Sequence, residues 1–157
     1  MSDPEKSRAV FVRRIHFSAA HAYAKPGASF EENKKIYGSS AMPAGLGHNF
    51  KLEAHFEGQI DSQTGMIVNL ADIDIWLKKM VAPLDHHHLN NDVEFFKANV
   101  PTAENIARYC FDTLKKIMTD VPVTHKPMNK AARLLKVRLH EGEDLWVDYS
   151  DSPIEIE

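Results

Sequence analysis

Two histidines in the sequence are placed where they could bind a metal ion. His21 ends a predicted strand, and His48 opens the next one after a glycine-rich loop. Side chains two residues apart on a strand share a face, so a His-x-His pair would offer two ligands here, but Leu46 occupies the first position. A catalytic zinc site normally has three protein ligands and a water, so two histidines are too few. These residues alone also fit a plainer interpretation, two polar side chains near strand ends.

A second group of candidates, Asp85 and the histidines 86–88, follows Pro83. A carboxylate beside an imidazole can fix its tautomer and raise its basicity, as general acid–base catalysis requires. Side chains of adjacent residues rarely bond each other directly, however, and three consecutive histidines are also typical of a solvated or metal-scavenging loop. Asp85 and His86 are therefore candidates for proton transfer, with that alternative open.

Glu141 and Cys110 are the other side chains with obvious chemistry. An acid at the end of a strand is usually exposed, but in a pocket Glu141 would accept two hydrogen bonds from a planar N–C–N group. Cys110 is the only cysteine and lies one helical turn from both Ile106 and Leu114. A buried thiol behaves as a small hydrophobic group, so we predict a structural role for it.

Strands and helices must position these residues, and hydrophobic periodicity predicts where they lie. The predicted strands are Ala9–His21, two arms of a hairpin over Asn49–Leu70 whose second arm is "MIVNL", Ala132–Glu141 and Asp144–Tyr149. A helix is expected after the N-cap Asn69 and is ended by Pro83, and a second helix follows the N-cap Thr102. Without β-α-β alternation, this order predicts an α+β fold with an antiparallel sheet.

Composition indicates one ordinary globular domain. The chain has 157 residues and a formal charge of −3, which gives no reason to expect nucleic acid or an anionic membrane as a partner. The apolar runs are too short to span a bilayer, and the polar start lacks the apolar segment of a secretory signal. We expect a disordered leader over 1–8, one domain over 9–151 and a tail over 152–157. A single cysteine fits a reducing cytoplasm.

Taken together, the segments that carry these residues resemble one enzyme family. They are "HFSAAHAY", "EENKKIYG", "GHNFKLEAHFEGQIDSQTGMIVNLADI", "PLDHHHLNNDV", "PTAENIA" and "VRLHE". Their order and spacing are similar to those of 6-pyruvoyltetrahydropterin synthase and its relative 6-carboxytetrahydropterin synthase, over Arg13 to Tyr149. The segments "TGMIVNLADI" and "EENKKIYG" resemble those of the pyruvoyl-type enzymes more than those of the carboxy-type enzymes.

The resemblance implies a fold, an assembly and a chemistry. The fold would be the tunnelling fold, a four-stranded antiparallel sheet with two helices on one face. The assembly would be a homohexamer of two trimers, with sites between subunits. The chemistry would be a lyase reaction on 7,8-dihydroneopterin triphosphate or a related dihydropterin, with zinc on three histidines, a proton-moving cysteine and an Asp–His pair.

Carried over position by position, the resemblance is uneven at the metal. The first and third zinc ligands fall on His21 and His48, but the second falls on Leu46, which cannot bind metal. The proton-moving cysteine falls on Ser40, whose hydroxyl is a far weaker acid than a thiol and needs a base to activate it. The resemblance therefore implies a weakened zinc site.

The remaining family positions are present. The Asp–His pair falls on Asp85 and His86, and the glutamate that anchors the pterin falls on Glu141. The segment whose backbone faces the pterin ring falls on Pro101–Asn105, which adds Thr102 and Glu104 to the substrate-binding candidates.

Three functions fit this mixture of kept and changed positions. The first is an enzyme of the family with an altered active site, in which His86 takes on more of the proton transfer. The second is a non-catalytic pterin-binding homologue. The third is a relative that cleaves the pterin side chain with an acid in the loop, where Glu31 and Glu32 lie, although these residues also fit a helix start.

Overall fold

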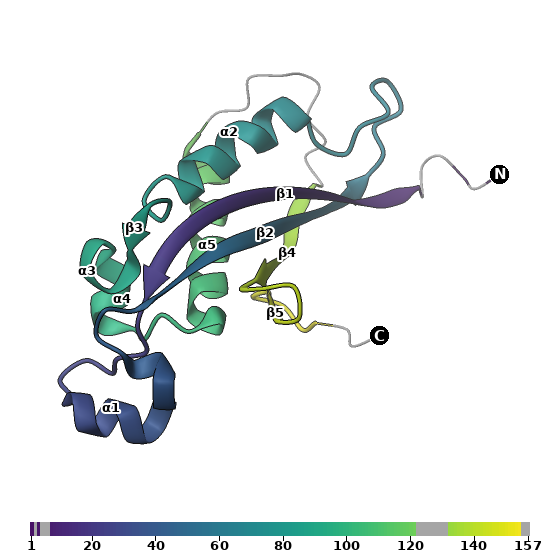
Figure 1. Cartoon of the computed structure of the whole chain (residues 1–157). Coiled ribbons are helices and arrows are strands. Elements are labelled where there is room, and N and C mark those ends of the chain that lie inside the picture. The colour runs from purple at the N-terminus through teal and green to yellow at the C-terminus, as the bar shows by residue number, and fades with distance from the viewer. Residues whose placement is uncertain (2, 4–6, 122–131, 155–157) are drawn as a thin grey trace.

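The protein is described by a computed structural model that covers residues 1, 3, 7–121 and 132–154. Half of the predicted leader (residues 2 and 4–6) and half of the predicted tail (residues 155–157) lie outside these residues. Two long strands form a curved ribbon that crosses in front of the longest helix (Figure 1). The elements are β1 (Arg8–His21), α1 (Phe30–Tyr37), the 3-10 helix η2 (Gly38–Ala41), β2 (Leu46–Gln59), α2 (Leu70–Val81), β3 (His87–His88), α3 (Leu89–Asp92), α4 (Glu94–Ala98), α5 (Ala103–Asp120), β4 (Arg133–His140) and β5 (Trp146–Tyr149).

The strands form one sheet in the order β3-β1-β2-β4-β5. The pairs β1–β2, β2–β4 and β4–β5 are antiparallel, which confirms the expected four-stranded antiparallel sheet. The two-residue strand β3 adds an unpredicted parallel pairing with β1 at the sheet edge. This pairing brings the histidine loop beside the end of β1.

The predicted strand "MIVNL" is wrong. Ile67 and Val68 are both buried although they are adjacent, so the side chains do not alternate between two faces as a strand requires. The Asp61 carboxylate accepts hydrogen bonds from the backbone of Gln63 and Thr64, which closes a tight turn. After this turn the chain passes directly into α2.

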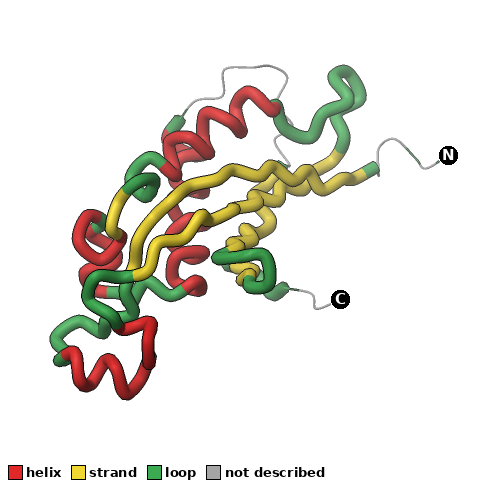
Figure 2. Tube along the Cα trace, viewed as in Figure 1, coloured by secondary structure: helices red, strands yellow, loops and turns green. Residues whose placement is uncertain are grey.

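Helices α2 and α5 cover one face of the sheet, as predicted (Figure 2). Both predicted caps are present: Asn69 accepts a hydrogen bond from Ala71 N–H (2.9 Å), and Thr102 accepts one from Asn105 N–H (3.2 Å). The core lies between these helices and the sheet. Its largest fully buried side chains include Phe50, Leu52, Phe56, Ile73, Leu77, Met80, Ile106, Phe111, Leu114 and Leu139.

Cys110 belongs to this core and has no exposed surface. Burial raises the pKa of its thiol well above the usual range, because the charged thiolate would lose its hydration. The structural role predicted for Cys110 agrees with this environment.

The short helices α3 and α4 and the 3-10 helix η2 were not predicted from the sequence, whereas the start of α1 was one of two interpretations of Glu31 and Glu32. Helix α1 lies beyond the end of the ribbon at which β1 stops (Figure 1). Its start is a capping box, in which the Ser29 hydroxyl accepts Glu32 N–H and the Glu32 carboxylate accepts Ser29 N–H. Glu31 and Glu32 therefore begin a helix, the plainer of the two interpretations given to them.

Within the described residues no helix combines the length and the apolar character needed to cross a membrane.

Candidate functional site

Three side chains from three strands meet at one end of the sheet. His21 is the last residue of β1, His48 lies three residues into β2 and pairs with Ala19, and Glu141 follows the last residue of β4. One ligand atom from each lies within 4.8 Å of the other two. We call His21, His48 and Glu141 the His–Glu cluster. It lies on the helix-covered face because the side chains continue the alternation of buried residues along each strand.

His21 is the most enclosed member of the His–Glu cluster, with 3% of its surface exposed. Its Nδ1–H donates to the carbonyl of Pro101 at 2.7 Å, since a carbonyl can only accept. Its ring also packs against Phe50 and His48, with centroids 5.6 Å and 5.1 Å away. The bond to Pro101 fixes the ring and leaves Nε2 facing the cluster, as in histidines that ligate metals.

The Glu141 carboxylate presents its two oxygens differently. Oε1 lies 3.1 Å from His48 Nε2 and 3.6 Å from His21 Nε2, while Oε2 is buried with no hydrogen-bond partner. The His21 side chain, with a smaller contribution from the charge of His48, lowers the pKa of Glu141 against the opposing effect of burial. Glu141 is therefore ionised at neutral pH and can act as a ligand or a hydrogen-bond acceptor.

Buried polar atoms without partners gather in this cluster. Nε2 of His21, Nε2 of His48 and Oε2 of Glu141 all lack a hydrogen bond. Native proteins leave few buried polar groups unpaired, so such a group often marks a place for a ligand, ion or water. Two imidazole nitrogens and a carboxylate oxygen form a donor set that zinc accepts.

Asp85 and His86 are held on β1 by two hydrogen bonds to Ser18. Asp85 Oδ1 accepts Ser18 N–H (2.9 Å), and His86 N–H donates to the Ser18 carbonyl (2.6 Å). His86 has φ = 61°, a left-handed conformation that costs energy outside glycine and is often found at functional sites. His86 Nε2 lies 3.5 Å from Asp85 Oδ2, so these adjacent side chains do approach each other.

One residue of the Asp85–His86 pair and one residue of the His–Glu cluster line the same hollow. This hollow measures about 430 Å³ and is lined by both His48 and His86. The side chain of His86 is exposed there, whereas the Nε2 atom of His48 is buried. A small molecule in this hollow would contact His48 and His86, whereas His21, Glu141 and Asp85 do not line it.

Ser40 lies near the His–Glu cluster through its backbone. Its carbonyl accepts a hydrogen bond from Tyr23 N–H (2.8 Å), and the Tyr23 ring lies 5.6 Å from the His21 ring. Leu46 is paired directly opposite His21, on the same face, and is 44% exposed. A histidine at position 46 would therefore stand beside His21, as the resemblance implies.

Comparison with known proteins identifies relatives of the chain. A family model described as 6-pyruvoyl tetrahydropterin synthase matches residues 11–152. The chain is 41% identical over 138 residues to the 6-pyruvoyl tetrahydrobiopterin synthase of Homo sapiens, covering 87% of this chain and 88% of the relative. It is 36% identical over 141 residues to that of Dictyostelium discoideum, covering 89% and 94%.

A solved structure gives the same result. The 6-pyruvoyl tetrahydropterin synthase of Caenorhabditis elegans superposes with a TM-score of 0.82 at 32% identity, covering 93% of this chain and 97% of that one. The chain belongs to the 6-pyruvoyl tetrahydropterin synthase family. The tunnelling fold expected from the resemblance is therefore confirmed, and pterin processing is the function of the family to which the chain belongs.

Tyr23 was missed from the sequence, and the backbone of Pro101, which the resemblance places at the pterin ring, was not predicted to contact His21. Pro101 supplies the carbonyl that fixes His21, and Tyr23 packs between His21 and Tyr37. Burial, and then the charge of Glu141, raises the pKa of the Tyr23 hydroxyl. Tyr23 lies two residues after His21, so strand periodicity could have placed both side chains on one face. The contact of Pro101, 80 residues away, has no signal in the sequence.

The two substrate-binding candidates on α5 differ in their surroundings. The Thr102 hydroxyl caps the helix by accepting Asn105 N–H, whereas Glu104 is exposed in the first turn. Glu104 still contributes to the raised pKa of Tyr23 through its charge. The start of α5 therefore faces the site mainly through the backbone at Pro101.

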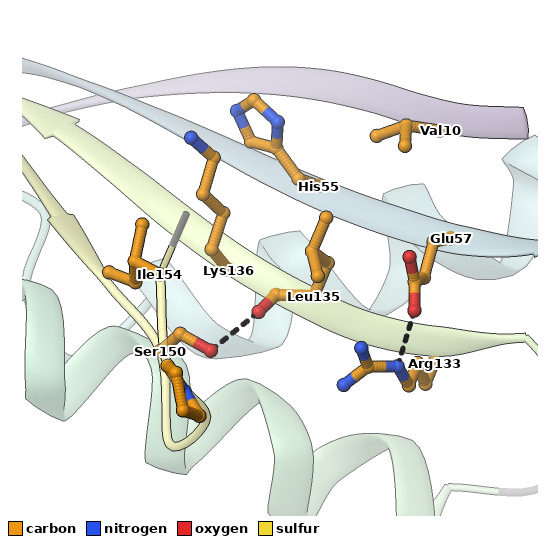
Figure 3. A pocket seen from close by; sticks show the side chains of 9 residues that line it. Val10, His55, Glu57, Arg133, Leu135, Lys136, Ser150 and Ile154 are labelled. Carbon is orange, nitrogen blue, oxygen red and sulfur yellow. Dashed lines mark hydrogen bonds and ion pairs between the residues drawn. The ribbon is translucent and has the colours of Figure 1, made fainter. Parts of the chain in front are cut away.

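A second hollow, of about 450 Å³, lies on the face of the sheet opposite the His–Glu cluster (Figure 3). Its ionic groups are paired: Arg133 Nε bonds Glu57 Oε1 at 2.6 Å, and Lys136 Nζ bonds Asp148 Oδ2 at 2.9 Å. Ser150 Oγ–H donates to the Leu135 carbonyl at 2.7 Å. Because these groups already satisfy each other, we place the candidate site at the His–Glu cluster and not in this hollow.

Proposed function

We propose that the protein is a cytoplasmic pterin-processing lyase of the 6-pyruvoyltetrahydropterin synthase type with an altered active site. Its substrate would be 7,8-dihydroneopterin triphosphate or a related dihydropterin. The observation that carries the proposal is the convergence of His21, His48 and Glu141, with unpartnered buried atoms, in a chain of this family. When bound there, zinc would polarise the side-chain oxygens of the substrate and so acidify the neighbouring C–H.

In this proposal Glu141 binds the pterin. Its Oε2 atom is buried and has no partner, so it can accept a hydrogen bond from an N–H of the aminopyrimidine ring. The lowered pKa of Glu141 keeps the carboxylate ionised at neutral pH, which strengthens that hydrogen bond. Thr102 would hold the start of α5, so that the backbone at Pro101 closes one side of the site.

His86 would move the proton. It lines the hollow that it shares with His48, and Asp85 lies 3.5 Å from its Nε2. The hydrogen bond from Ser18 N–H to Asp85 fixes the carboxylate that orients the imidazole. Ser40 keeps the family position of the cysteine but has no thiolate to offer, so His86 is the stronger acceptor.

We also propose that the protein assembles as a homohexamer of two trimers, as the family resemblance implies. Exposed apolar side chains in the single chain support burial against neighbouring copies. Val10 and Val12 are exposed, and the alternation along β1 places them on the sheet face that α2 and α5 leave uncovered. His86 is exposed as well, which fits a site completed by another subunit. Light scattering of the purified protein measures the mass of the assembly.

The test is a turnover assay on zinc-replete protein. Release of triphosphate and a change in the pterin ultraviolet spectrum are expected, and His86→Gln should lower kcat about 10²–10⁴-fold, the contribution of a general base. His87→Gln, one residue along and exposed, is the matched control and should retain the rate. No turnover across several dihydropterins, together with pterin binding by calorimetry, would establish the non-catalytic homologue instead.

A further inference from the structure

We infer that Glu141 is the third protein ligand of the metal centre and takes the role that Leu46 cannot fill. The site would be a His2Glu centre for zinc, formed by His21 Nε2, His48 Nε2 and Glu141 Oε1. This inference deepens the proposed function and rests on it for the choice of metal. It changes the part played by Glu141, which the resemblance assigns to the pterin alone.

The distances fit a tetrahedral ion. Zinc ligands at about 2.0–2.2 Å in a tetrahedral arrangement stand about 3.3–3.6 Å from one another. Glu141 Oε1 lies 3.6 Å from His21 Nε2 and 3.1 Å from His48 Nε2. Two of the three ligand–ligand distances are therefore close to those around a tetrahedral ion, and all three ligand atoms lie within 4.8 Å of one another.

The orientations also fit a metal better than an ion pair. The 3.6 Å contact of Glu141 with His21 is too long for a hydrogen bond, and the Nε2 atoms of both histidines lack a partner in hydrogen-bond geometry. His21 already donates its Nδ1–H to Pro101. Its Nε2 lone pair is therefore free to bind a cation, and the hydrogen bond to Pro101 fixes the ring as an outer partner of a metal ligand does.

The location of Glu141 explains how a ligand can be replaced without a nearby substitution. Position 46 is opposite His21 on β2, but Glu141 arrives from β4, on the other side of β2. Val137 and Leu139 are fully buried, and Glu141 continues their alternation onto the same face. The carboxylate thus enters the site from the strand next to His48 and needs no space at position 46.

One carboxylate can serve both the metal and the pterin. Oε1 is turned toward the two imidazoles, and Oε2 is buried without a partner. Oε1 would bind zinc while Oε2 accepts a pterin N–H. Two ligands from histidine and one from glutamate, with an open fourth position, match the pattern of catalytic zinc sites.

Zinc titration of the metal-free full-length protein tests this inference without any pterin. The wild type should bind one zinc per chain by calorimetry, and Co²⁺ should give the intense visible absorption of a tetrahedral site. Glu141→Gln should weaken zinc binding at least about 100-fold, since loss of even an outer partner costs about 10–100-fold. Glu143→Gln, an exposed acid two residues along, is the matched control and should leave affinity unchanged.

A rescue variant sharpens the test. Adding Leu46→His to Glu141→Gln should restore zinc binding through three histidines, because position 46 faces His21 across the strand pair. If Glu141→Gln fails to fold by circular dichroism, Glu141→Asp provides the same comparison with a shortened carboxylate.

Two outcomes would overturn the inference. One is equal zinc affinity in wild type and Glu141→Gln. The other is no zinc binding by wild type together with binding by Leu46→His, which would show that the leucine simply abolished the metal site. Either result leaves the turnover and pterin-binding assays to judge the proposed function separately, since the titration contains no pterin.

Discussion

Strand β4 and the residues beside it contribute to two charged clusters on opposite faces of the sheet. The His–Glu cluster lies on the helix-covered face. On the other face, Asp148 of β5 accepts hydrogen bonds from Arg138 Nε (2.7 Å), Arg138 Nη2 (2.9 Å) and Lys136 Nζ (2.9 Å). We call Lys136, Arg138 and Asp148 the Asp148 cluster. In the first cluster buried polar atoms remain unpartnered, whereas in the second each ionic group has a partner of opposite charge.

This difference suits the Asp148 cluster to stabilising the fold and the His–Glu cluster to binding a ligand. Paired charges lower each other's energy in the folded chain, so the Asp148 cluster has little left to offer a ligand and instead ties β4 to β5. Buried donors and acceptors without partners raise the free energy of the folded chain, and a ligand that pairs with them removes this cost. The hollow of about 450 Å³ lies by the paired groups, and the proposed site lies by the unpaired ones, so hollow size was not the basis for choosing the proposed site.

Removing a histidine should have the largest effect on this comparison. His21→Ala deletes a proposed ligand and the ring that bonds Pro101, so zinc affinity should fall at least about 100-fold. His16→Ala, exposed on the same strand, is the control and should bind zinc like wild type. Calorimetric titration measures both. If His21→Ala bound zinc as tightly as wild type, the His–Glu cluster could no longer be distinguished from the Asp148 cluster as a binding site.

Asp148→Asn should reduce stability and leave zinc binding intact. The hydrogen bonds from Arg138, with help from Lys136, lower the pKa of Asp148 to about 2. A depression of this size from the ordinary value corresponds to about 2 kcal/mol of unfolding free energy at neutral pH. Urea denaturation of Asp148→Asn and of the exposed control Asp144→Asn measures the loss.

The effect of Asp148→Asn should also depend on pH with a definite sign. Because the folded pKa is lowered, the stabilisation is complete above the unfolded pKa near 4 and disappears as pH falls toward 2. The stability difference between wild type and Asp148→Asn should therefore shrink between about pH 5 and pH 2. A difference that stays constant over this interval would mean that Asp148 contributes by packing and not by charge.

Removing the cap of α5 should have the smallest effect. Thr102→Ala loses the hydrogen bond to Asn105 N–H and should cost about 1 kcal/mol of unfolding free energy. Thr102→Ser keeps the hydroxyl and should restore most of that loss. Because Pro101 directly precedes the cap, zinc affinity should change less than in His21→Ala. A larger loss of zinc affinity than of stability would assign Thr102 to the site itself.

Local patterns predicted much of the fold. Asn69 and Thr102 were recognisable as caps because a short polar side chain stood just before each helical pattern, and each cap depends on neighbours within three residues. The strand "MIVNL" failed for the opposite reason. Its composition favours a strand, but Ile67 and Val68 are both drawn into the core, so tertiary packing overrode local preference.

The sequence by itself determined which side chains were available and in what local setting: His21 at the end of β1, His48 near the start of β2, Glu141 after β4, and no histidine at position 46. Only the tertiary structure decided that Glu141 Oε1 faces both imidazoles and that Pro101 holds His21. These contacts join residues 80 to 120 positions apart, and strand pairing and helix packing create them. Periodicity reports which face a side chain occupies, but carries no information on which distant partner shares that face.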